Sequence, residues 1–435
     1  MRGQGGGTWT GRYRAVAAVI ALLVAFLPRP IPAATGAAAV QVGLEVVEAD
    51  LGAPLQGKKV GLVVTPGSVT ADGRHSIDVL RKAGVNVVLL FAHERALRTR
   101  TAVWDRVAQN LDGTPFLGRP EAESAGRRVD ADTRLPIIDL GSAKLAAQDV
   151  RDLDAIVFDL QDPGVRFFTV MGRLQQCMET AADAGIEFVV LDRPNPLGGD
   201  LVEGPAREAG PTVRAVLTNL APGPLVHGLT TGEMAQLIRS RLAKPLRLTV
   251  VPMKGWKRGM SWADTGRPWA SIAPNLRSPE AALVYPGLGL LEATNVSEGR
   301  GTDQPFLLFG APWLEAGKLP SVSTTGFAIE PARFTPRPSA FAVNPKHKDA
   351  ECVGARIAVR DPSAAHPYEF GVQLLRFLTG QKGFAWSAPS ALDDLVGTAR
   401  LRKALEAGES AAQILAADGP AIEKFRKDRA KFLLY

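Results

Sequence analysis

The sequence predicts an α/β fold: a Rossmann-like parallel sheet domain, then a smaller α+β C-terminal domain, with an active-site cleft between them. Two observations support this. Up to about residue 195, short β-branched segments alternate with segments of helical periodicity, as in βαβ units with parallel strands. From about residue 225 the pattern changes to a Trp-, Pro- and Gly-rich stretch that reaches about residue 345 and is followed by helices.

Four short apolar segments bounded by Gly, Pro or polar residues are expected to be buried strands. They are residues 58–64, 85–91, 155–158 and 188–191. Helices are expected at 75–83 and 167–184, the second ending at Gly185. Residues 99–150 are polar and contain Gly and Pro, so we expect them to form an excursion over the sheet edge.

The second half begins with a capping box, Thr230-Thr-Gly-Glu233, which predicts a helix over 234–242. A strand is expected at 246–252, and helices at 368–378 and 421–433. The expected domain boundaries are 1–34 for a signal peptide, 41–228 for the Rossmann-like domain and 229–435 for the α+β domain.

The N-terminus has the order of a secretory signal peptide. Arg12 and Arg14 precede an apolar run over 15–27, and Pro32-Ala33-Ala34 supplies small residues for cleavage. The run is too short for an ordinary membrane span, although an uncleaved anchor remains an alternative. The whole chain carries 51 basic and 44 acidic residues, but four arginines and no acid fall within 1–34, which leaves 47 against 44. We therefore expect export to the periplasm or medium, and no nucleic-acid partner.

Neither a metal nor a cofactor is expected. The five histidines are scattered and no CxxC occurs. His93-Glu94 does not begin an HExxH motif, because Leu97 stands at the second ligand position, and Gly287-Leu-Gly289 lacks the third glycine of a dinucleotide-binding loop. Cys177 and Cys352 could form one disulfide after export, but Cys177 lies on the apolar stripe of a helix, where a buried free thiol is commoner.

Charged residues follow the ends of several predicted strands. They are His93-Glu94, Asp159-Leu-Gln-Asp162 and Asp192-Arg193-Pro-Asn195. Ligands of open α/β sheets bind beyond the carboxyl ends of the strands, and burial beside like charges can raise a carboxyl pKa as a general acid requires. The aspartates could instead cap the following helices. Glu94 suits a cap poorly, which favours a functional role.

A polar loop, Glu292-Ala-Thr-Asn295-Val-Ser-Glu298-Gly-Arg300-Gly-Thr302, follows an apolar stretch in the second half. It can present carboxylate, amide and guanidinium groups to a polyhydroxylated ligand, although a solvated turn is the alternative. Trp256, Trp262 and Trp269 could stack on sugar faces or simply pack in the core.

Several motifs together resemble the exo-β-N-acetylmuramidase family, which removes N-acetylmuramic acid from the non-reducing ends of peptidoglycan fragments. They are Asp159-Leu-Gln-Asp162-Pro-Gly-Val-Arg166-Phe167, Leu191-Asp-Arg-Pro-Asn-Pro196, Glu203-Gly-Pro205, His227-Gly228, Val251-Pro-Met-Lys-Gly-Trp256, Asn295-Val-Ser-Glu-Gly-Arg-Gly-Thr302 and the terminal Phe432-Leu-Leu-Tyr435. The resemblance covers roughly residues 42–435. It implies a Rossmann-like domain joined to a second domain, with the active site in the cleft.

The resemblance also implies roles for individual residues. The family's presumed catalytic Glu corresponds to Glu94, which would protonate the leaving oxygen, and Asp162 or Glu298 would activate water or stabilise the oxocarbenium-like charge. A cation should meet the lactyl carboxylate of the sugar, and the candidates are Arg166, Arg193 and Arg300. Within the shared motifs, the other residues expected to bind substrate are Asp192, Asn195, His227 and Asn295.

The neighbours of Glu94 differ from the family pattern, because His93, Arg95 and Ala96 replace the family's Pro, His and Gly. Arg95 would lower the pKa of Glu94 if it pointed inward. Two alternatives therefore stay open beside the hydrolase: a catalytically weakened relative that binds muropeptide sugars, and a hydrolase for a different terminal sugar.

Overall fold

Seven strands form the first sheet of the computed structural model. They are β1 (Lys59–Val64), β2 (Asn86–Ala92), β3 (Arg128–Val129), β4 (Pro136–Asp139), β5 (Ala155–Phe158), β6 (Glu187–Leu191) and β7 (Leu248–Val251), in the order β3-β4-β2-β1-β5-β6-β7. All neighbours pair in parallel except β3 and β4, which are antiparallel. The structure describes residues 39–93, 128–130, 132–140, 145–208, 213, 215–315, 325–339, 341–388 and 390–435.

Helices cover both faces of this sheet, as the alternation of side chains along each strand requires. On β5, Ala155 and Val157 join the core beneath α2 (Gly43–Ala49) and α3 (Ser76–Lys82). Ile156 and Phe158 join the opposite core with α5 (Thr169–Ala184) and α6 (Thr231–Arg239). The predicted Rossmann-like parallel sheet is confirmed.

The chain reverses direction across the sheet between β1 and β5. From β1 it moves outward to β2 and β4, and it then returns to β5 on the other side of β1. The segments after β1 and after β5 therefore diverge at their carboxyl ends, which is the topological switch point where open α/β sheets bind ligands.

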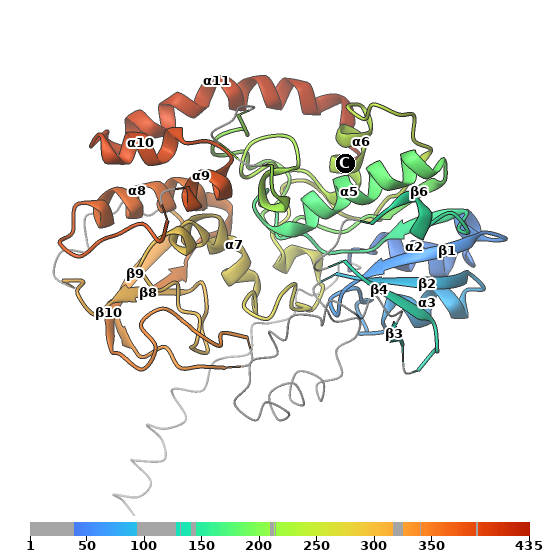
Figure 1. Cartoon of the computed structure of the whole chain (residues 1–435), viewed down its shortest axis with the longest axis horizontal. Helices are drawn as coiled ribbons and strands as arrows, with labels where there is room; N and C mark the ends of the chain where they lie inside the picture. The colour runs from blue at the N-terminus through green and yellow to red at the C-terminus, as the bar shows by residue number, and fades with distance from the viewer. Residues whose placement is uncertain are drawn as a thin grey trace, which may run out of the picture. The chain divides into compact units, whose positions relative to one another are not determined.

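A second sheet of three antiparallel strands lies in the last third of the chain. Its strands are β8 (Leu308–Ala311), β10 (Cys352–Val359) and β9 (Phe327–Phe334), in that order. The accompanying helices are α7 (Pro279–Leu288), α8 (Pro367–Thr379), α9 (Ala391–Val396), α10 (Arg400–Glu406) and α11 (Ala411–Arg429). Figure 1 shows α11 running from the region above α8 to α6, so the end of the chain returns to the first sheet.

The first sheet extends past residue 228, where we expected the two domains to meet, because β7 pairs with β6. Residues 38–435 form one compact unit. The expected excursion at 99–150 contributes β4 to the sheet, paired with β2; residues 94–127 lie outside the described part, as do 1–38. Cys177 and Cys352 are both buried free thiols. No helix within the described ranges is long and apolar enough to cross a membrane.

Candidate active site

A pocket of about 210 Å³ lies at the switch point of the first sheet. Its wall includes Gly67 and Thr70 after β1, Gln161 after β5 and Arg193 after β6, and it is completed by Arg267 and Trp269 from the segment after β7. We call it the carboxyl-edge pocket. The expectation that ligands bind beyond the carboxyl ends of the strands therefore agrees with a pocket at this edge, lined by polar and aromatic side chains.

Asp159 and Arg193 form a buried, two-bonded ion pair beside this pocket. Arg193 Nε and Nη2 donate to the Asp159 carboxylate at 2.6 and 2.8 Å, and the side chains of Asp159 and Arg193 are 0% and 4% exposed. Arg193 Nη1 also donates to the carbonyl of Val69 at 3.1 Å. The pair fixes the arginine across the ends of β5 and β6, so its position is set before any ligand arrives.

Asp162 and His227 meet behind the same edge. The backbone N–H of Gly164, which has a positive φ of 89°, donates to Asp162 Oδ2 at 2.6 Å. His227 Nδ1 accepts from Leu229 N–H at 3.1 Å, so a neutral ring carries its proton on Nε2, 3.4 Å from Asp162 Oδ2. Burial raises the pKa of Asp162, and His227 and the Gly164 N–H oppose that rise.

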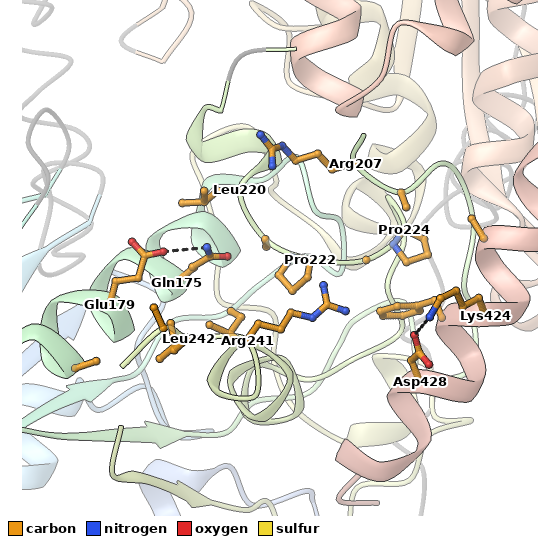
Figure 2. Close-up of a pocket in the computed structure, with 18 of the residues that line it drawn as sticks. Gln175, Glu179, Arg207, Leu220, Pro222, Pro224, Arg241, Leu242, Lys424 and Asp428 are labelled. Carbon is orange, nitrogen blue, oxygen red and sulfur yellow. Dashed lines mark hydrogen bonds and ion pairs between the residues drawn. The ribbon is translucent and has the colours of Figure 1, made fainter. Parts of the chain in front are cut away.

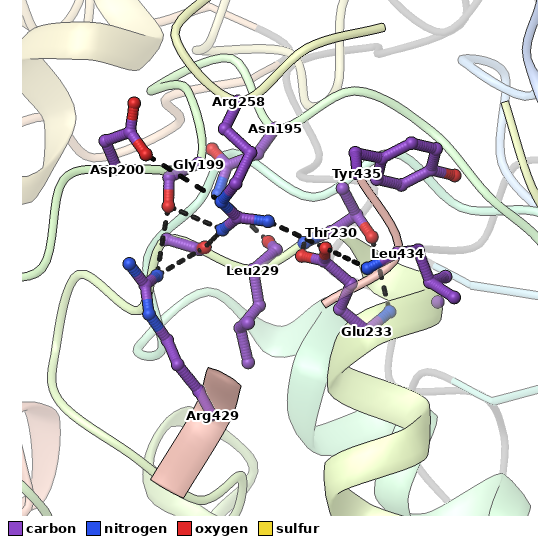
Figure 3. Close-up of polar contacts among 12 residues, drawn as sticks. Asn195, Gly199, Asp200, Leu229, Thr230, Glu233, Arg258, Arg429, Leu434 and Tyr435 are labelled. Carbon is purple, nitrogen blue, oxygen red and sulfur yellow. Dashed lines mark hydrogen bonds and ion pairs between the residues drawn. The ribbon is translucent and has the colours of Figure 1, made fainter. Parts of the chain in front are cut away.

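Asp192 binds the last residue of the chain. The Tyr435 hydroxyl donates to Asp192 Oδ2 at 2.8 Å, as does Thr230 Oγ1 at 2.7 Å. Figure 3 shows the adjoining network, in which Glu233 accepts from Leu434 N–H at 2.9 Å and from Arg258 at 2.7 Å. Burial raises the pKa of Asp192 to about 6, although the hydrogen bonds that its carboxylate accepts from Gly232 N–H, Thr230 and Tyr435 oppose the rise.

Replacing Tyr435 by Phe is expected to destabilise the protein more at pH 8 than at pH 5. The folded-state pKa of Asp192 is raised from 3.8 to about 6, so stability falls as the pH rises between these two values and the cost of the buried charge is fully present above about 6. The Tyr435 hydroxyl offsets that cost by donating to the ionised carboxylate. Its loss should therefore lower the free energy of unfolding by about 1.5–3 kcal/mol above pH 6 and by less below it. Urea unfolding at both pH values measures this, and an equal loss at both would contradict the assignment.

Two carboxylates and two cations meet in the C-terminal loop. Glu298 lies 3.0 Å from Lys346 Nζ and 3.6 Å from Arg300 Nη1, and Arg300 Nη2 lies 3.2 Å from Glu292 Oε1. We call these four residues the acid–base cluster. Burial raises the pKa of Glu292, Arg300 opposes that rise and Glu298 adds to it. The Arg300 side chain remains 33% exposed, so it can contact a ligand.

Tyr285 connects this cluster to the first sheet. Its hydroxyl lies 3.4 Å from Glu292 Oε1, and its ring packs edge-on against Phe167 and Phe168 at 5.1 and 6.1 Å. The next residue, Thr169, begins α5 and lies 3.1 Å from His93 Nε2 at the end of β2. The acid–base cluster therefore lies on the same side of the sheet as the end of β2.

Three other residues that were expected to bind substrate donate hydrogen bonds to backbone carbonyls of the protein itself. Arg166 is fully buried, and its Nη2 donates to the carbonyls of Pro205 and Val396 at 3.1 and 2.5 Å. The Asn195 amide donates to Leu229 O at 3.0 Å, and the Asn295 amide to Gly383 O at 2.7 Å. In this structure these three side chains brace loops. Glu94, the expected acid, lies outside the described residues, directly after His93.

The tryptophans pack within the protein. Trp262 and Trp269 meet edge to face at 4.8 Å and both border the carboxyl-edge pocket. Their indole N–H groups donate to the backbone carbonyls of Arg267 and Leu276. Trp256 packs edge-on against Tyr435 at 5.1 Å. Two of the three could thus present part of a ring to a ligand at the pocket.

Sequence reasoning missed four residues of the site: Tyr285, Glu292, Lys346 and Arg267. Glu292 lay in the polar loop, and its charge was a usable signal. Tyr285 sits inside an apolar helix, and Lys346 reaches Glu298 from a separate segment. Arg267 pairs with Glu45 at 2.7 Å, from the other end of the chain. Within the ranges that the structure covers, no group of three or more His, Cys, Asp or Glu side chains could hold a metal ion.

Known proteins of similar sequence and structure match most of this chain. A protein from Bacillus subtilis (strain 168) named peptidoglycan beta-N-acetylmuramidase NamZ is 33% identical over 405 residues, which is 91% of each chain. Two crystal structures of DUF1343 family proteins from Bacteroides fragilis superpose with TM-scores of 0.78 and 0.72 at 28% and 26% identity. They cover 92% of this chain and 100% and 99% of their own.

The two halves of the chain also match the two domains that define one family. Residues 60–280 match the N-terminal domain of exo-beta-N-acetylmuramidase NamZ, and residues 283–435 match its C-terminal domain. The junction falls before β8 and after β7, so each sheet belongs to one domain. The chain therefore belongs to the NamZ family of exo-beta-N-acetylmuramidases.

Proposed function

We propose that the protein is an exo-acting glycoside hydrolase that releases N-acetylmuramic acid from the non-reducing ends of peptidoglycan fragments. One observation supports this most strongly. The acid–base cluster lies on the side of the sheet where β2 ends, and Glu94 stands two residues after the end of β2 in the sequence. Most glycosidases use two carboxyl groups, one to protonate the leaving oxygen and one to act on the anomeric carbon or on water.

In this proposal Glu94 is the general acid and Glu298 is the second carboxylate. Glu298 is held by Lys346 and Arg300, so it can present negative charge to an oxocarbenium-like centre. Asp162 is equally buried but is the less favoured partner, because its basic neighbour is His227 at 3.4 Å and no Lys or Arg pairs with it among the described residues. Arg300 is the most exposed of the three candidate arginines and is the proposed contact for the lactyl carboxylate.

Changing Glu298 to Gln is expected to lower kcat about 10²–10³-fold, and the melting temperature of the variant measures how much stability the loss of this buried charge costs. The amide keeps the shape of the side chain and removes the charge. Glu330 offers a matched control, because it also pairs with two basic side chains, Arg356 at 3.0 Å and Arg360 at 2.7 Å, on β9 of the second sheet. Glu330→Gln should leave kcat unchanged. Equal effects of the two changes would contradict a catalytic role for Glu298.

A panel of chromogenic glycosides distinguishes the proposal from its two alternatives. The proposal predicts turnover of the N-acetylmuraminide and slow or no turnover of N-acetylglucosaminide or glucoside. Faster turnover of another sugar would indicate a different terminal specificity. Calorimetric binding of a muramoyl-glucosamine disaccharide with no turnover of any substrate would indicate a sugar-binding protein that has lost catalysis.

We also propose that residues 1–34 direct export to the periplasm or medium and are then removed, which leaves no stable membrane anchor. The apolar run between Arg14 and Pro28 supports this. N-terminal sequencing of the protein from a cell fractionation experiment should begin near residue 35. Full-length protein in the cytoplasmic fraction would contradict the export signal.

A further inference from the structure

A second cavity, of about 700 Å³, lies away from the candidate active site. Figure 2 shows it bordered by the second half of α5, the end of α6, the segment Leu220–Pro224 and α11. Thr169, at the start of α5, lies at the carboxyl edge, whereas Ala182 lines the cavity. At a rise of about 1.5 Å per residue, these two positions on α5 are about 20 Å apart. The cavity is therefore separate from the site described above.

The cavity contains two arginines whose side chains form no ion pair among the described residues, although Lys424 and, less strongly, Arg241 lower the pKa of Asp428. Its wall carries four basic and three acidic side chains. Lys244 pairs with Asp183 at 2.8 Å, Lys424 pairs with Asp428 at 2.6 Å, and Glu179 accepts from Gln175 at 3.0 Å. Within the same part of the chain, neither Arg207 nor Arg241 has a side-chain hydrogen bond or ion pair. Arg207 Nε is moreover buried without an acceptor.

A second buried cation makes the Arg207 end more electropositive. Arg207 and Arg166 both lie against Gly397: a side chain at that position would place its Cβ 2.6 Å from Arg166 Nη1 and 3.2 Å from Arg207 Cβ. Arg166 donates to two carbonyls only, and its Nε and Nη1 have no acceptor in the described structure. The pKa of Arg166 is lowered to about 10, mainly by burial and also by the positive charge of Arg207. An anion at Arg207 would relieve this repulsion.

The surface between the two arginines is apolar. Figure 2 shows Arg241 pointing into the space between Pro222 and the Lys424–Asp428 pair, with Arg207 on the other side of Pro222. The apolar part of the cavity wall also includes Leu220, Pro224 and Phe425. Cavities of several hundred Å³ with an apolar lining and a few placed charges are typical of sites for small ligands.

We propose that this cavity binds a short acidic peptide, with one carboxylate on Arg241, a second on Arg207 and small apolar groups over Pro222. Guanidinium groups bind carboxylates through paired N–H donors. Two separated arginines suit an extended ligand with two carboxylates better than a single small anion. The binding is non-catalytic and does not depend on the proposed hydrolase activity.

Calorimetry on the full chain tests the proposal with acetyl-Ala-Glu-Ala, which carries two carboxylates. We expect a Kd of about 1 mM or tighter. The neutral analogue acetyl-Ala-Gln-Ala-amide should bind at least about tenfold more weakly. Equal binding of the two peptides, or no binding of either, would overturn the proposal. Inorganic phosphate titrated in the same way separates a peptide site from a simple anion site: phosphate binding tighter than the acidic peptide would overturn the peptide assignment.

Single variants then locate the binding. Arg207→Gln and Arg241→Gln should each weaken the acidic peptide about tenfold while leaving the melting temperature and sugar hydrolysis unchanged. Lys244→Gln is the matched control, because it removes one positive charge from the same cavity at a lysine that already has a carboxylate partner, Asp183 at 2.8 Å. It should change the Kd less than about twofold. A control effect as large as that of the arginine variants would show general charge attraction and overturn the assigned contacts.

Discussion

Replacing Glu94 by Gln is expected to lower kcat for a muramoyl-glucosamine disaccharide about 10³-fold. The amide has nearly the same shape but cannot protonate the leaving oxygen, and a sugar hydroxyl is a poor leaving group without that proton. Measured sugar release, followed by chromatography, gives the change in kcat. KM should change little, since the uncharged part of the side chain remains.

The leaving group supplies the control for this prediction. A 4-nitrophenyl glycoside departs as a stable anion and needs much less proton donation. The Glu94→Gln variant should therefore lose far less activity on the 4-nitrophenyl N-acetylmuraminide than on the disaccharide. Equal losses on the two substrates would contradict an acid role and indicate that Glu94 positions the sugar instead.

Replacing Arg193 by Met is expected to lower the free energy of unfolding by about 3–5 kcal/mol. Asp159, which is 0% exposed, would lose both guanidinium hydrogen bonds and remain as a buried carboxylate without a cation. Urea unfolding at pH 7 measures the loss. Because the pair shapes the carboxyl-edge pocket, weaker sugar binding should accompany it.

Two further variants test the reason for that effect. Arg333 pairs with Glu351 at 2.6 Å, but their side chains are 64% and 60% exposed, so Arg333→Met should cost less than about 1 kcal/mol. The double change Arg193→Met with Asp159→Asn should recover part of the loss, since no uncompensated charge remains. A loss from Arg193→Met as small as that from Arg333→Met would contradict the buried-pair account.

The first sheet was largely predictable because each of its elements carries a local pattern. The strand expected at 155–158 is β5, and the helix expected at 167–184 is α5 with a start two residues later. The terminal helix was expected over 421–433, and a proline such as Pro420 usually interrupts a helix. In the structure α11 begins at Ala411, where Ser410 and Gln413 form a capping box, and it continues through Pro420.

The α+β class of the C-terminal part was predicted and is confirmed, but the three strands of its sheet were not placed, because their pattern is weak. β9 has one buried residue, Phe327, and it contains Glu330, Pro331 and Arg333, so its sequence lacks the apolar run of a buried strand. β9 is held as a strand by its antiparallel pairing with β10. That pairing joins segments about 20 residues apart, a range at which local sequence patterns give little information.

The candidate site was predicted by its location more than by its contacts. The position of polar residues at strand ends identified Arg193, which lines the carboxyl-edge pocket, and Asp159, which pairs with it. The same reasoning also selected Asn195 as a substrate-binding residue, but its amide donates to the carbonyl of Leu229 in a neighbouring loop. The pairs Glu298–Lys346 and Asp192–Tyr435 join distant segments. Such pairs depend on how the two sheets pack, which no local pattern specifies.

Product analysis on two disaccharides tests directly whether the protein removes N-acetylmuramic acid from the non-reducing end. One carries N-acetylmuramic acid at the non-reducing end and N-acetylglucosamine at the reducing end, and the other carries them in the opposite order. The account predicts that the protein releases free N-acetylmuramic acid from the first disaccharide and leaves the second intact. Release from the first no faster than with the Glu94→Gln variant, or equal cleavage of both, would contradict it.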